Sequence, residues 1–511
     1  MKKLVYISIF ISILFGLESC SNEFLEIPPQ GSVTTANFYK TQSQFEQALI
    51  GAYASIREAK GSIASWVMGE MRSDNTHYEY NNLNRGLAFS EREDTAGFLD
   101  DNSSSYISSK YNSCYIGIAR VNQILDKIDG AEINQPAKNR IIGESKFIRA
   151  LLYFELVRYF GAVSLHLNAV EGATQAYLPR SPVVEVYNAI EADLLDAIQN
   201  LPVASFPQNG RATKGAAHVL LADAYMTQKR NSDAETQLRA ILPMGYELLP
   251  DYGSVFSLNN KNSRESLFEI QYQEGNQGQQ SNFIYPFLPL SADVSLITGI
   301  QSQNRNAGGW NTPTQEMIDT YEPGDKRLET SIGIVEGTGP VGAMVIESVK
   351  SPVGYSTPSG KRSYVFIRKY LNPHSVESNT DDNFPIYRYS DVLLLLAEAL
   401  NEQGKSLEAL DYLNLVRIRA GLTPSNEANQ DLLRDLILHE RRVEFAFENK
   451  RWLDLVRTDR AIEVMNLHGE YLKTLHPILR DVSYNVTPNR LLFPIPQREI
   501  LIGNLEQNPG Y

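Results

Sequence analysis

Two polar stretches that are rich in aromatic residues contain the side chains best suited to ligand chemistry. Residues 74–82 and 282–310 combine tyrosine, phenylalanine and tryptophan rings with carboxylate, amide and guanidinium groups. Sugar rings have apolar C–H faces and polar edges, so a site for them needs flat aromatic platforms beside such hydrogen-bonding groups. The candidate ligand-binding residues are Asp74, Asn75, Tyr78, Tyr80, Asn81, Tyr285, Arg305 and Trp310.

The aromatic residues of this set also have a structural interpretation. Large aromatic side chains are mostly buried in folded proteins, and packing beneath the loops is the favoured interpretation for Trp310. The same interpretation applies to Tyr285. Tyr78 and Tyr80 lie in a very polar stretch, so we expect them to be more exposed.

Motifs for catalysis are incomplete throughout the sequence. The pair His439-Glu440 lacks the second histidine of a zinc-protease motif. The segment 354–358 lacks the closing glycine of a nucleophile elbow. The segment 354–361 has five residues between its glycines, whereas a P-loop has four. We therefore expect a protein that is not an enzyme, with no catalytic residues, no metal and no cofactor.

The N-terminus has the features of a bacterial lipoprotein signal. Two lysines precede an uncharged run of 14 residues, 4–17, which is too short to span a bilayer comfortably. Glu18-Ser19-Cys20 follows directly and resembles a lipobox, although glutamate is unusual at its position. On this interpretation residues 1–19 are cleaved off, and acyl chains on Cys20 hold the protein at a membrane surface. The alternative is a plain secretory signal followed by an incidental cysteine.

Composition limits the classes of function. The chain has 511 residues, of which 42% are hydrophobic, which is enough for a large core without disulfides. Acylation of Cys20 would leave Cys114 as the single thiol, so no internal disulfide is expected. The formal net charge of −13 argues against nucleic acid as a partner, because phosphates need lysine and arginine.

Apolar residues recur at helical spacing along most of the chain, which predicts a mostly α fold. The helices form four tetratricopeptide-like pairs by length and turn geometry. These pairs act as a scaffold for a loop-rich ligand-binding face, which we place in the Gly-, Asn- and Ser-rich blocks 61–109 and 272–384. The four predicted pairs span 41–129 (with a long insertion), 137–200, 212–242 and 391–420.

The charged residues of 441–457 are predicted to lie on one helical stretch. Arginine and carboxylate residues three positions apart would form ion pairs along it, which stabilise a helix modestly. Charge runs on helices are usually solvated or paired faces, so we interpret these residues as structural and not catalytic.

A set of collinear motifs runs through residues 20–511. The motifs are Cys20–Glu26, Phe45–Tyr53, Gly143–Phe154, Ala212–Ala217, Trp310–Thr314, Asp325–Arg327, Pro385–Tyr389, Ala397–Ala399, Asn414–Gly421, Arg441–Glu448, Arg451–Arg457, Phe493–Pro496 and Gln507–Tyr511. Together they resemble the RagB/SusD family of surface nutrient-binding lipoproteins. No single motif is decisive, but their order along the chain is that of the family, and the C-terminal third is the most specific part.

The resemblance implies a function and partners. It implies a SusD-like protein at the cell outer membrane, lipid-anchored and facing the exterior, that binds a glycan ligand. It also implies delivery of that ligand to a SusC-like TonB-dependent transporter, over which the protein sits as a lid. Two alternatives remain: the same architecture capturing peptides or another nutrient, and a tetratricopeptide-like scaffold that binds only proteins.

The expected domain organisation follows from the signal and the resemblance. A signal peptide (1–19) precedes an acylated cysteine with an extended leader (20–40). An N-terminal SusD-like helical region (41–271) is then followed by a C-terminal RagB/SusD region (272–511). We expect these last two regions to pack as one globular unit.

Overall fold

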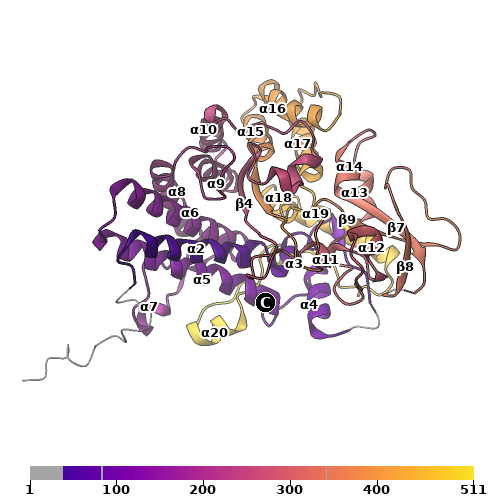
Figure 1. The fold of residues 1–511 in the computed structure, drawn as a ribbon, viewed down its shortest axis with the longest axis horizontal. Helices are drawn as coiled ribbons and strands as arrows, with labels where there is room; N and C mark the ends of the chain where they lie inside the picture. Colours follow the sequence, from indigo (N-terminus) through magenta and orange to yellow (C-terminus); the bar gives the residue numbers. More distant parts are fainter. Residues whose placement is uncertain (1–37, 82–84, 341) are drawn as a thin grey trace, which may run out of the picture.

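The structure is a computed structural model that describes residues 38–81, 85–340 and 342–511. The predicted signal peptide and Cys20 lie outside the described residues. Helices predominate in the described chain (Figure 1). The fold class predicted from the sequence is therefore confirmed.

Four packed helix pairs form the scaffold, and each corresponds to a predicted pair with ends shifted by a few residues. In Figure 1 they occupy the left and upper parts of the molecule. Within each pair, apolar stripes at helical spacing face one another and become buried. The pairs are α2 (Gln42–Lys60) with α5 (Ser105–Lys127), α6 (Gln135–Phe160) with α8 (Val183–Asn200), α9 (Lys214–Thr227) with α10 (Asn231–Ile241), and α15 (Tyr389–Glu402) with α16 (Ser406–Arg419).

Local sequence signals set the ends of these helices. At the start of α2, the Thr41 hydroxyl accepts a hydrogen bond from the Gln44 N–H, and the Gln44 side chain accepts one from the Thr41 N–H. This reciprocal arrangement satisfies two amides that the helix leaves unpaired. Between α15 and α16, Gly404 has a φ of +74°, a left-handed conformation that glycine adopts without a Cβ clash.

Shorter helices fill the connections and the C-terminal region. The remaining α-helices are α3 (Ile63–Gly69), α4 (Leu87–Ala96), α7 (Ala173–Ala176), α11 (Ile284–Phe287), α12 (Ser295–Thr298), α13 (Gln315–Thr320), α14 (Arg327–Ser331), α17 (Gln430–Glu444), α18 (Arg451–Arg457), α19 (Ala461–Leu475) and α20 (Gln497–Gly503). Single 3₁₀ turns lie at Ile128–Gly130, Leu242–Met244, Gly253–Phe256, Leu258–Asn260 and Pro488–Arg490.

The segment 272–384, predicted to be loop-rich, contains all four strands of a small sheet at the right of Figure 1. Its strand order is β5-β8-β7-β9, with β7 antiparallel to both neighbours and β5 parallel to β8. Three two-stranded ladders, β1-β6, β2-β3 and β4-β10, complete the strands. The strands are β1 (Thr76–His77), β2 (Val163–Ser164), β3 (Arg180–Ser181), β4 (Ser266–Ile270), β5 (Ser291–Asp293), β6 (Thr312–Pro313), β7 (Ile332–Thr338), β8 (Met344–Lys350), β9 (Arg362–Ile367) and β10 (Phe384–Arg388).

The charged segment 441–457 is not the single helix that the sequence predicted. Helix α17 ends at Glu444 and α18 begins at Arg451, with a turn over 445–449. Phe447 and Asn449 both have positive φ there, which ends helical geometry.

The predicted ion pairs along this segment are also mostly wrong. The i,i+3 pattern predicted three pairs: Arg441–Glu444, Glu448–Arg451 and Asp454–Arg457. Among the described residues the last of these is formed. Glu444 is instead fully buried and pairs with other segments. Its burial alone would raise its pKa, but the surrounding guanidinium charges hold it well below the usual range. A buried carboxylate needs such partners to remain charged. The partners of Glu444 are Arg327, Arg388 and Arg419.

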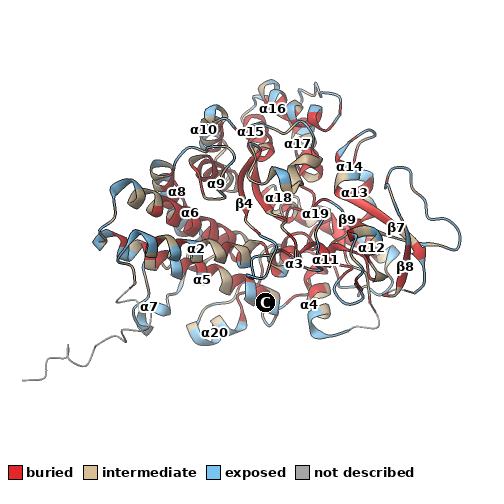
Figure 2. Cartoon of the chain, in the orientation of Figure 1, coloured by how far each residue is buried: buried red, intermediate tan, exposed pale blue. Residues whose placement is uncertain are grey.

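One buried hydrophobic cluster joins the N-terminal helices to the C-terminal region. Figure 2 shows buried residues along the inner faces of the helices and exposed residues on their outer faces. Of the candidate ligand residues, Tyr285 belongs to this core, whereas Trp310 and Tyr78 pack in a second, smaller cluster with Val67, Met71 and Ala96.

Candidate functional site

A cavity of about 300 Å³ lies beside the small sheet. Four segments that are distant in the sequence meet around it. We call it the aromatic cavity because tyrosine and histidine rings make up much of its wall. Its lining residues are His77, Tyr78, Glu79, Tyr80, Thr312, Pro313, Thr314, Gln315, Ser363, Tyr364, Val365, Tyr471, Leu472, Leu475 and His476.

Strand pairing brings the first three of these segments together. Strand β1 pairs with β6 so that His77 lies opposite Thr312, and β6 lies beside β9. The chain beyond β1 is held by a 2.8 Å hydrogen bond from the Glu79 N–H to the Gly309 carbonyl. Gly309 has a φ of +77°, and a Cβ there would lie 2.9 Å from the Cβ of Glu79, so glycine permits this close approach.

Three rings form a continuous stack at the wall of the cavity. The ring centroids of Tyr78 and His77 are 4.2 Å apart, and those of His77 and His476 are 4.6 Å apart. The hydroxyl of Tyr484 lies 3.3 Å from Nδ1 of His77 and fixes the central ring from behind. A rigid stack of this kind presents ready-made flat surfaces to a ligand.

The lining carries little charge at neutral pH. It contains no lysine or arginine among the described residues, and Glu79 is its single carboxylate. Burial raises the pKa of Glu79 to about 8, although a hydrogen bond from the Leu290 N–H opposes this. Burial, together with the neighbouring imidazoles of His476 and His468, lowers the pKa of His77 well below 6.5. The cavity therefore suits a ligand that offers hydroxyl groups and apolar faces rather than charge.

Two of the eight candidate residues, Tyr78 and Tyr80, line this cavity and are half-buried. The Arg85 guanidinium lies 4.4 Å from the ring centroid of Tyr80 and is paired with Glu93. Both tyrosines are more exposed than the other aromatic candidates, Tyr285 and Trp310, as the sequence predicted.

The prediction that Asp74 and Asn75 contact a ligand is corrected, because both side chains are buried in the interior. The Asp74 side chain is 4% exposed, and its carboxylate pairs with Arg442 and Arg451 at 3.0 and 2.8 Å. The Asn75 amide donates to the Glu70 carboxylate and accepts from the Arg442 guanidinium. These groups anchor the loop that leads into β1, and we do not retain them as ligand contacts.

Tyr285 and Trp310 are packing residues in this structure. Tyr285 is 2% exposed, and its hydroxyl lies 2.8 Å from Nε2 of His374. Trp310 is 6% exposed and packs with Val67, Met71 and Ala96, with the Arg92 guanidinium against its ring. The structure thus agrees with the packing interpretation.

Asn81 and Arg305 lie close together but outside the lining. The Asn81 side chain is buried, and its amide donates to the Arg305 carbonyl at 3.4 Å. The Arg305 residue is exposed. The structure therefore brings together Tyr78 with Tyr80, and Asn81 with Arg305, but does not unite all eight residues.

Sequence reasoning missed the other ring residues of the cavity. Tyr364, Tyr471 and His476 are more than 280 positions from Tyr78 in the chain. Tyr364 lies on a strand inside a segment that was predicted to be loop, and Tyr471 lies on an ordinary amphipathic helix. Among the local signals, the continuous run of aromatic and β-branched residues at 364–367 could have suggested that strand.

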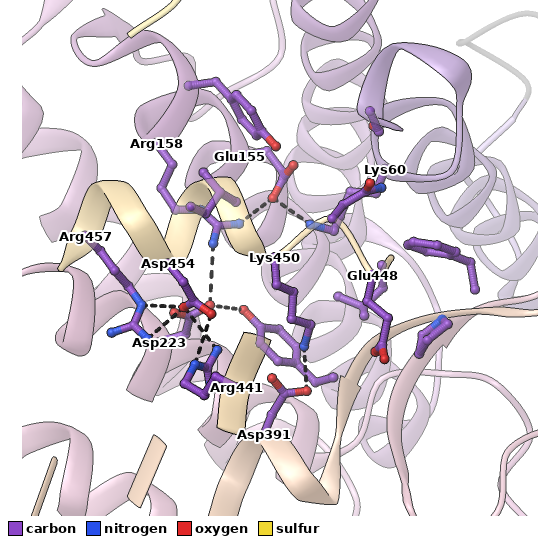
Figure 3. A pocket seen from close by; sticks show the side chains of 18 of the residues that line it. Lys60, Glu155, Arg158, Asp223, Asp391, Arg441, Glu448, Lys450, Asp454 and Arg457 are labelled. Carbon is purple, nitrogen blue, oxygen red and sulfur yellow. Dashed lines mark hydrogen bonds and ion pairs between the residues drawn. The ribbon is translucent and has the colours of Figure 1, made fainter. Parts of the chain in front are cut away.

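A second feature, in the interior, is a cluster of charged side chains between the N-terminal helices and α18 (Figure 3). In it Glu155 accepts from Lys60 and Lys110, and Arg158 approaches Asp223 at 3.5 Å. The space they enclose is about 40 Å³. That volume suits one or two water molecules and not a nutrient, so we interpret the cluster as a structural junction.

Neither a metal centre nor a membrane span is found in the part of the chain that the structure describes. No group of three or more histidine, cysteine, aspartate or glutamate side chains there has a metal-binding arrangement. No helix among the same residues is long and apolar enough to cross a membrane.

Comparisons with known proteins agree with this architecture. Residues 264–511 match the SusD family, and residues 23–226 match a family described as starch-binding associating with outer membrane. Two SusD-like proteins of Formosa agariphila are 29% and 27% identical to this chain, and both alignments cover the whole of both chains.

A solved structure has the same fold. A laminarin-binding SusD-like protein superposes with a TM-score of 0.73 at 25% identity, covering 93% of this chain and all of the other. The match extends over the helix pairs and the loop face together, since it covers nearly the whole chain.

Proposed function

Since the chain belongs to the SusD family, we propose that it is a glycan-binding lipoprotein that captures oligosaccharides in the aromatic cavity. It delivers them to a SusC-like TonB-dependent transporter in the outer membrane. The family matches support association with the outer membrane, since one of the two families is described in those words.

The names of relatives point to carbohydrate. The family matched by residues 23–226 is described as starch-binding, and the similar solved structure is of a laminarin-binding protein. Starch and laminarin are both polysaccharides of uncharged sugars. An uncharged glycan also fits the cavity of this chain, whose lining has no lysine or arginine among the described residues and holds its one carboxylate at a raised pKa.

The observation that carries the proposal is the aromatic cavity itself. Its volume of about 300 Å³ is at the small end of the range of ligand pockets, roughly 300–1,000 Å³, and suits a short segment of a glycan. Tyr78, Tyr80 and Tyr471 offer ring faces and phenolic hydroxyls around one space. Ring faces cover the C–H face of a sugar, and the hydroxyls with Ser363 and Gln315 offer hydrogen bonds to its edge.

The proposed role is capture without chemistry. The cavity holds no nucleophile beside a general base, and its Glu79 carboxylate stands without a second carboxylate in the lining. Hydrolysis of a glycosidic bond requires a pair of carboxyl groups about the scissile bond, roughly 5–10 Å apart. We therefore propose a binding protein and not a glycosidase.

Anchoring and partnership follow from the proposed acylation of Cys20. A lipid tether confines the protein to the membrane surface and raises its local concentration near a transporter, so modest contacts suffice for a lasting complex. We propose that the acylated protein faces the cell exterior, where the polysaccharide is available.

A glycan array followed by calorimetry tests the site. We expect laminari- or malto-oligosaccharides to bind the full chain, and Tyr78→Ala, Tyr80→Ala and Tyr471→Ala each to weaken binding by about 1–3 kcal/mol. Tyr177→Ala is the matched control, because Tyr177 is exposed and lies outside the aromatic cavity. Melting curves establish that each variant is folded. Unchanged affinity in all three folded variants, or binding of peptides and no glycan, would contradict the proposal.

A further inference from the structure

Helix α2 has a second apolar face besides the one that packs in the core. Phe45, Leu49, Ala52 and Ile56 form the buried stripe. Ile50, Tyr53 and Ala54 lie at positions i, i+3 and i+4 on another face, where Ile50 is 61% exposed. A scaffold helix that needed only to pack in the core would have polar residues at these positions.

This outer face forms one wall of a cavity of about 600 Å³, twice the volume of the aromatic cavity. The opposite wall is β4 with the residues that follow it, 271–273 and 279, and the loop 209–211 closes one end. Gly210 has a φ of +77°, and a Cβ there would lie 2.5 Å from the Gln271 side chain, so glycine lets this loop approach the opposite wall. We call this space the second cavity.

The second cavity shares no lining residue with the aromatic cavity. Its elements, α2 and β4, lie left of and at the centre of Figure 1, whereas β9 and α19 of the aromatic cavity lie to the right. The two spaces are therefore separate.

Tyr53 supplies a rigid platform in the second cavity. Its hydroxyl donates to the Glu144 carboxylate at 2.7 Å and accepts from the Ala212 N–H at 2.9 Å. The Phe268 ring supports it at a centroid distance of 6.4 Å. A half-buried ring that is held at its hydroxyl loses no freedom when a ligand covers it, which favours binding.

Side-chain amides line the second cavity. The side-chain amides of Gln273 and Gln279 are exposed at the cavity and make no hydrogen bond to any described residue. Each amide offers donors and an acceptor, which match the hydroxyl groups of a sugar.

The charged groups of the second cavity already have hydrogen-bonding or ion-pair partners, and the Glu269 carboxylate accepts a hydrogen bond from the Asn262 N–H. Lys261 lies 3.0 Å from Asp381, and Arg211 lies 2.7 Å from Glu144. Arg57 donates to the Gly278 carbonyl at 3.2 Å. An anionic ligand would have to break these pairs, so the available groups are neutral amides and an aromatic face.

From these observations we propose that the second cavity is an additional carbohydrate-binding site for an uncharged oligosaccharide segment. It goes beyond the proposed function, since it adds a site that does not depend on the aromatic cavity. With two sites on one molecule, a long glycan chain or two chains are retained more firmly than by either site alone.

The test fills the second cavity without removing a polar group. Ala54 is half-buried on the cavity wall, and Ala54→Trp places a bulky side chain in the space. Gln47→Trp is the matched control, because Gln47 is exposed on the same helix and outside the cavity. The second variant, Gln273→Ala with Gln279→Ala, removes the free amides and leaves the helix unchanged. Laminari- and malto-oligosaccharides are titrated into the full chain by calorimetry, with melting curves for each variant.

We expect two binding sites per chain in the parent protein. In the Tyr78→Ala, Tyr80→Ala background one site remains, and Ala54→Trp then reduces its affinity at least tenfold, whereas Gln47→Trp leaves it unchanged. The double glutamine variant weakens the same site about threefold to thirtyfold, as the loss of one or two hydrogen bonds predicts.

Other outcomes separate this proposal from the proposed function. Binding that is unchanged in Tyr78→Ala and Tyr80→Ala but lost in Ala54→Trp supports a site in the second cavity. The same result contradicts the site proposed in the aromatic cavity. If calorimetry gives one binding site per chain and Ala54→Trp does not alter the binding, the proposal of a second site is overturned. If Ala54→Trp abolishes co-purification with the transporter but leaves the glycan affinity intact, the proposal is also overturned and the second cavity is assigned to a protein contact. The proposal is overturned as well if these oligosaccharides do not bind to the parent chain.

Discussion

The Asp74 carboxylate shows how single residues in the loop before β1 support the site without touching a ligand. It is enclosed by the guanidinium groups of Arg442 and Arg451, which come from α17 and α18. Burial alone would raise the pKa of Asp74, but these two charges outweigh it and hold the pKa well below the usual range. The pair therefore ties the loop that carries Tyr78 to the C-terminal helices.

Asp74→Asn is expected to lower the free energy of unfolding by about 3–5 kcal/mol, because it leaves two buried guanidinium groups without their counter-charge. Denaturant unfolding measures this loss. The control is Asp129→Asn, since Asp129 pairs with Lys138 at the surface and should contribute about 0–1 kcal/mol. A stable Asp74→Asn variant with weakened glycan binding would instead make Asp74 a ligand contact.

His77 makes the stability of the site dependent on pH. Burial first, and then the neighbouring His476 and His468, lower its pKa well below 6.5, so the folded state keeps the imidazole neutral. Below about pH 6.5 the unfolded chain binds a proton at this residue that the folded chain does not. Folding is therefore destabilised progressively as the pH falls from about 6.5 towards the folded-state pKa.

At pH 5.5 this effect amounts to about 1.4 kcal/mol for His77, one pH unit below the unfolded value. His77→Gln is expected to lose that much less stability than the parent chain between pH 7.5 and pH 5.5. Denaturant midpoints at the two pH values provide the comparison. Equal losses in both proteins would show that His77 is protonated in the folded state.

At the scale of elements, the helix pairs pack closely where small residues meet. Gly117 on α5 is such a point, because a Cβ there would lie 2.4 Å from Cδ1 of Leu152 on α6 and 3.0 Å from Cβ of Ser55 on α2. The first neighbour is the flexible end of a side chain, but the second is close to the backbone. Three helices therefore depend on the absence of a side chain at one position.

Gly117→Val is expected to destabilise the protein by about 1–3 kcal/mol through overpacking between α5, α6 and α2. Ala119→Val is the control on the same helix, since Ala119 is exposed and the change there affects only helix propensity, by roughly 0.5 kcal/mol. Thermal melting of both variants gives the comparison. Similar melting temperatures for the two would show that the helices separate easily at Gly117.

The whole molecule combines a helical scaffold, a loop face and a proposed lipid anchor. The continuous core joins the first helix pairs to the C-terminal region, so the segments around the aromatic cavity are held by residues from both halves of the chain. Binding energy gained at the cavity is therefore not lost in ordering the loops.

Cys20→Ser is expected to move the protein from the membrane fraction to the soluble fraction, because one cysteine would carry all the acyl chains. Fractionation of cells that lack the SusC-like transporter measures the effect without a second point of attachment. Ser21→Ala, next to the acylated residue, is the control and should stay with the membrane. Membrane association of Cys20→Ser in those cells would contradict the proposed anchor.

The sequence by itself was sufficient for the scaffold, because the signals for helices are local. Apolar spacing, the capping residues at Thr41 and the glycine at position 404 act within one or two turns, so they predict the four pairs without a knowledge of the fold. The same reasoning failed at 441–457, where Glu444 and Glu448 pair with Arg388 and Arg451 pairs with Asp74, all partners from distant segments.

Only the tertiary structure decided which aromatic residues face a ligand. Tyr78 and Tyr285 are the same residue type, but one lines the aromatic cavity and the other is packed against His374. Exposure depends on which distant segments cover a side chain, and strand β9 and helix α19 reach Tyr78 from more than 280 positions along the chain. The physical reason is that long-range packing, unlike helix periodicity, leaves no pattern in the neighbouring residues.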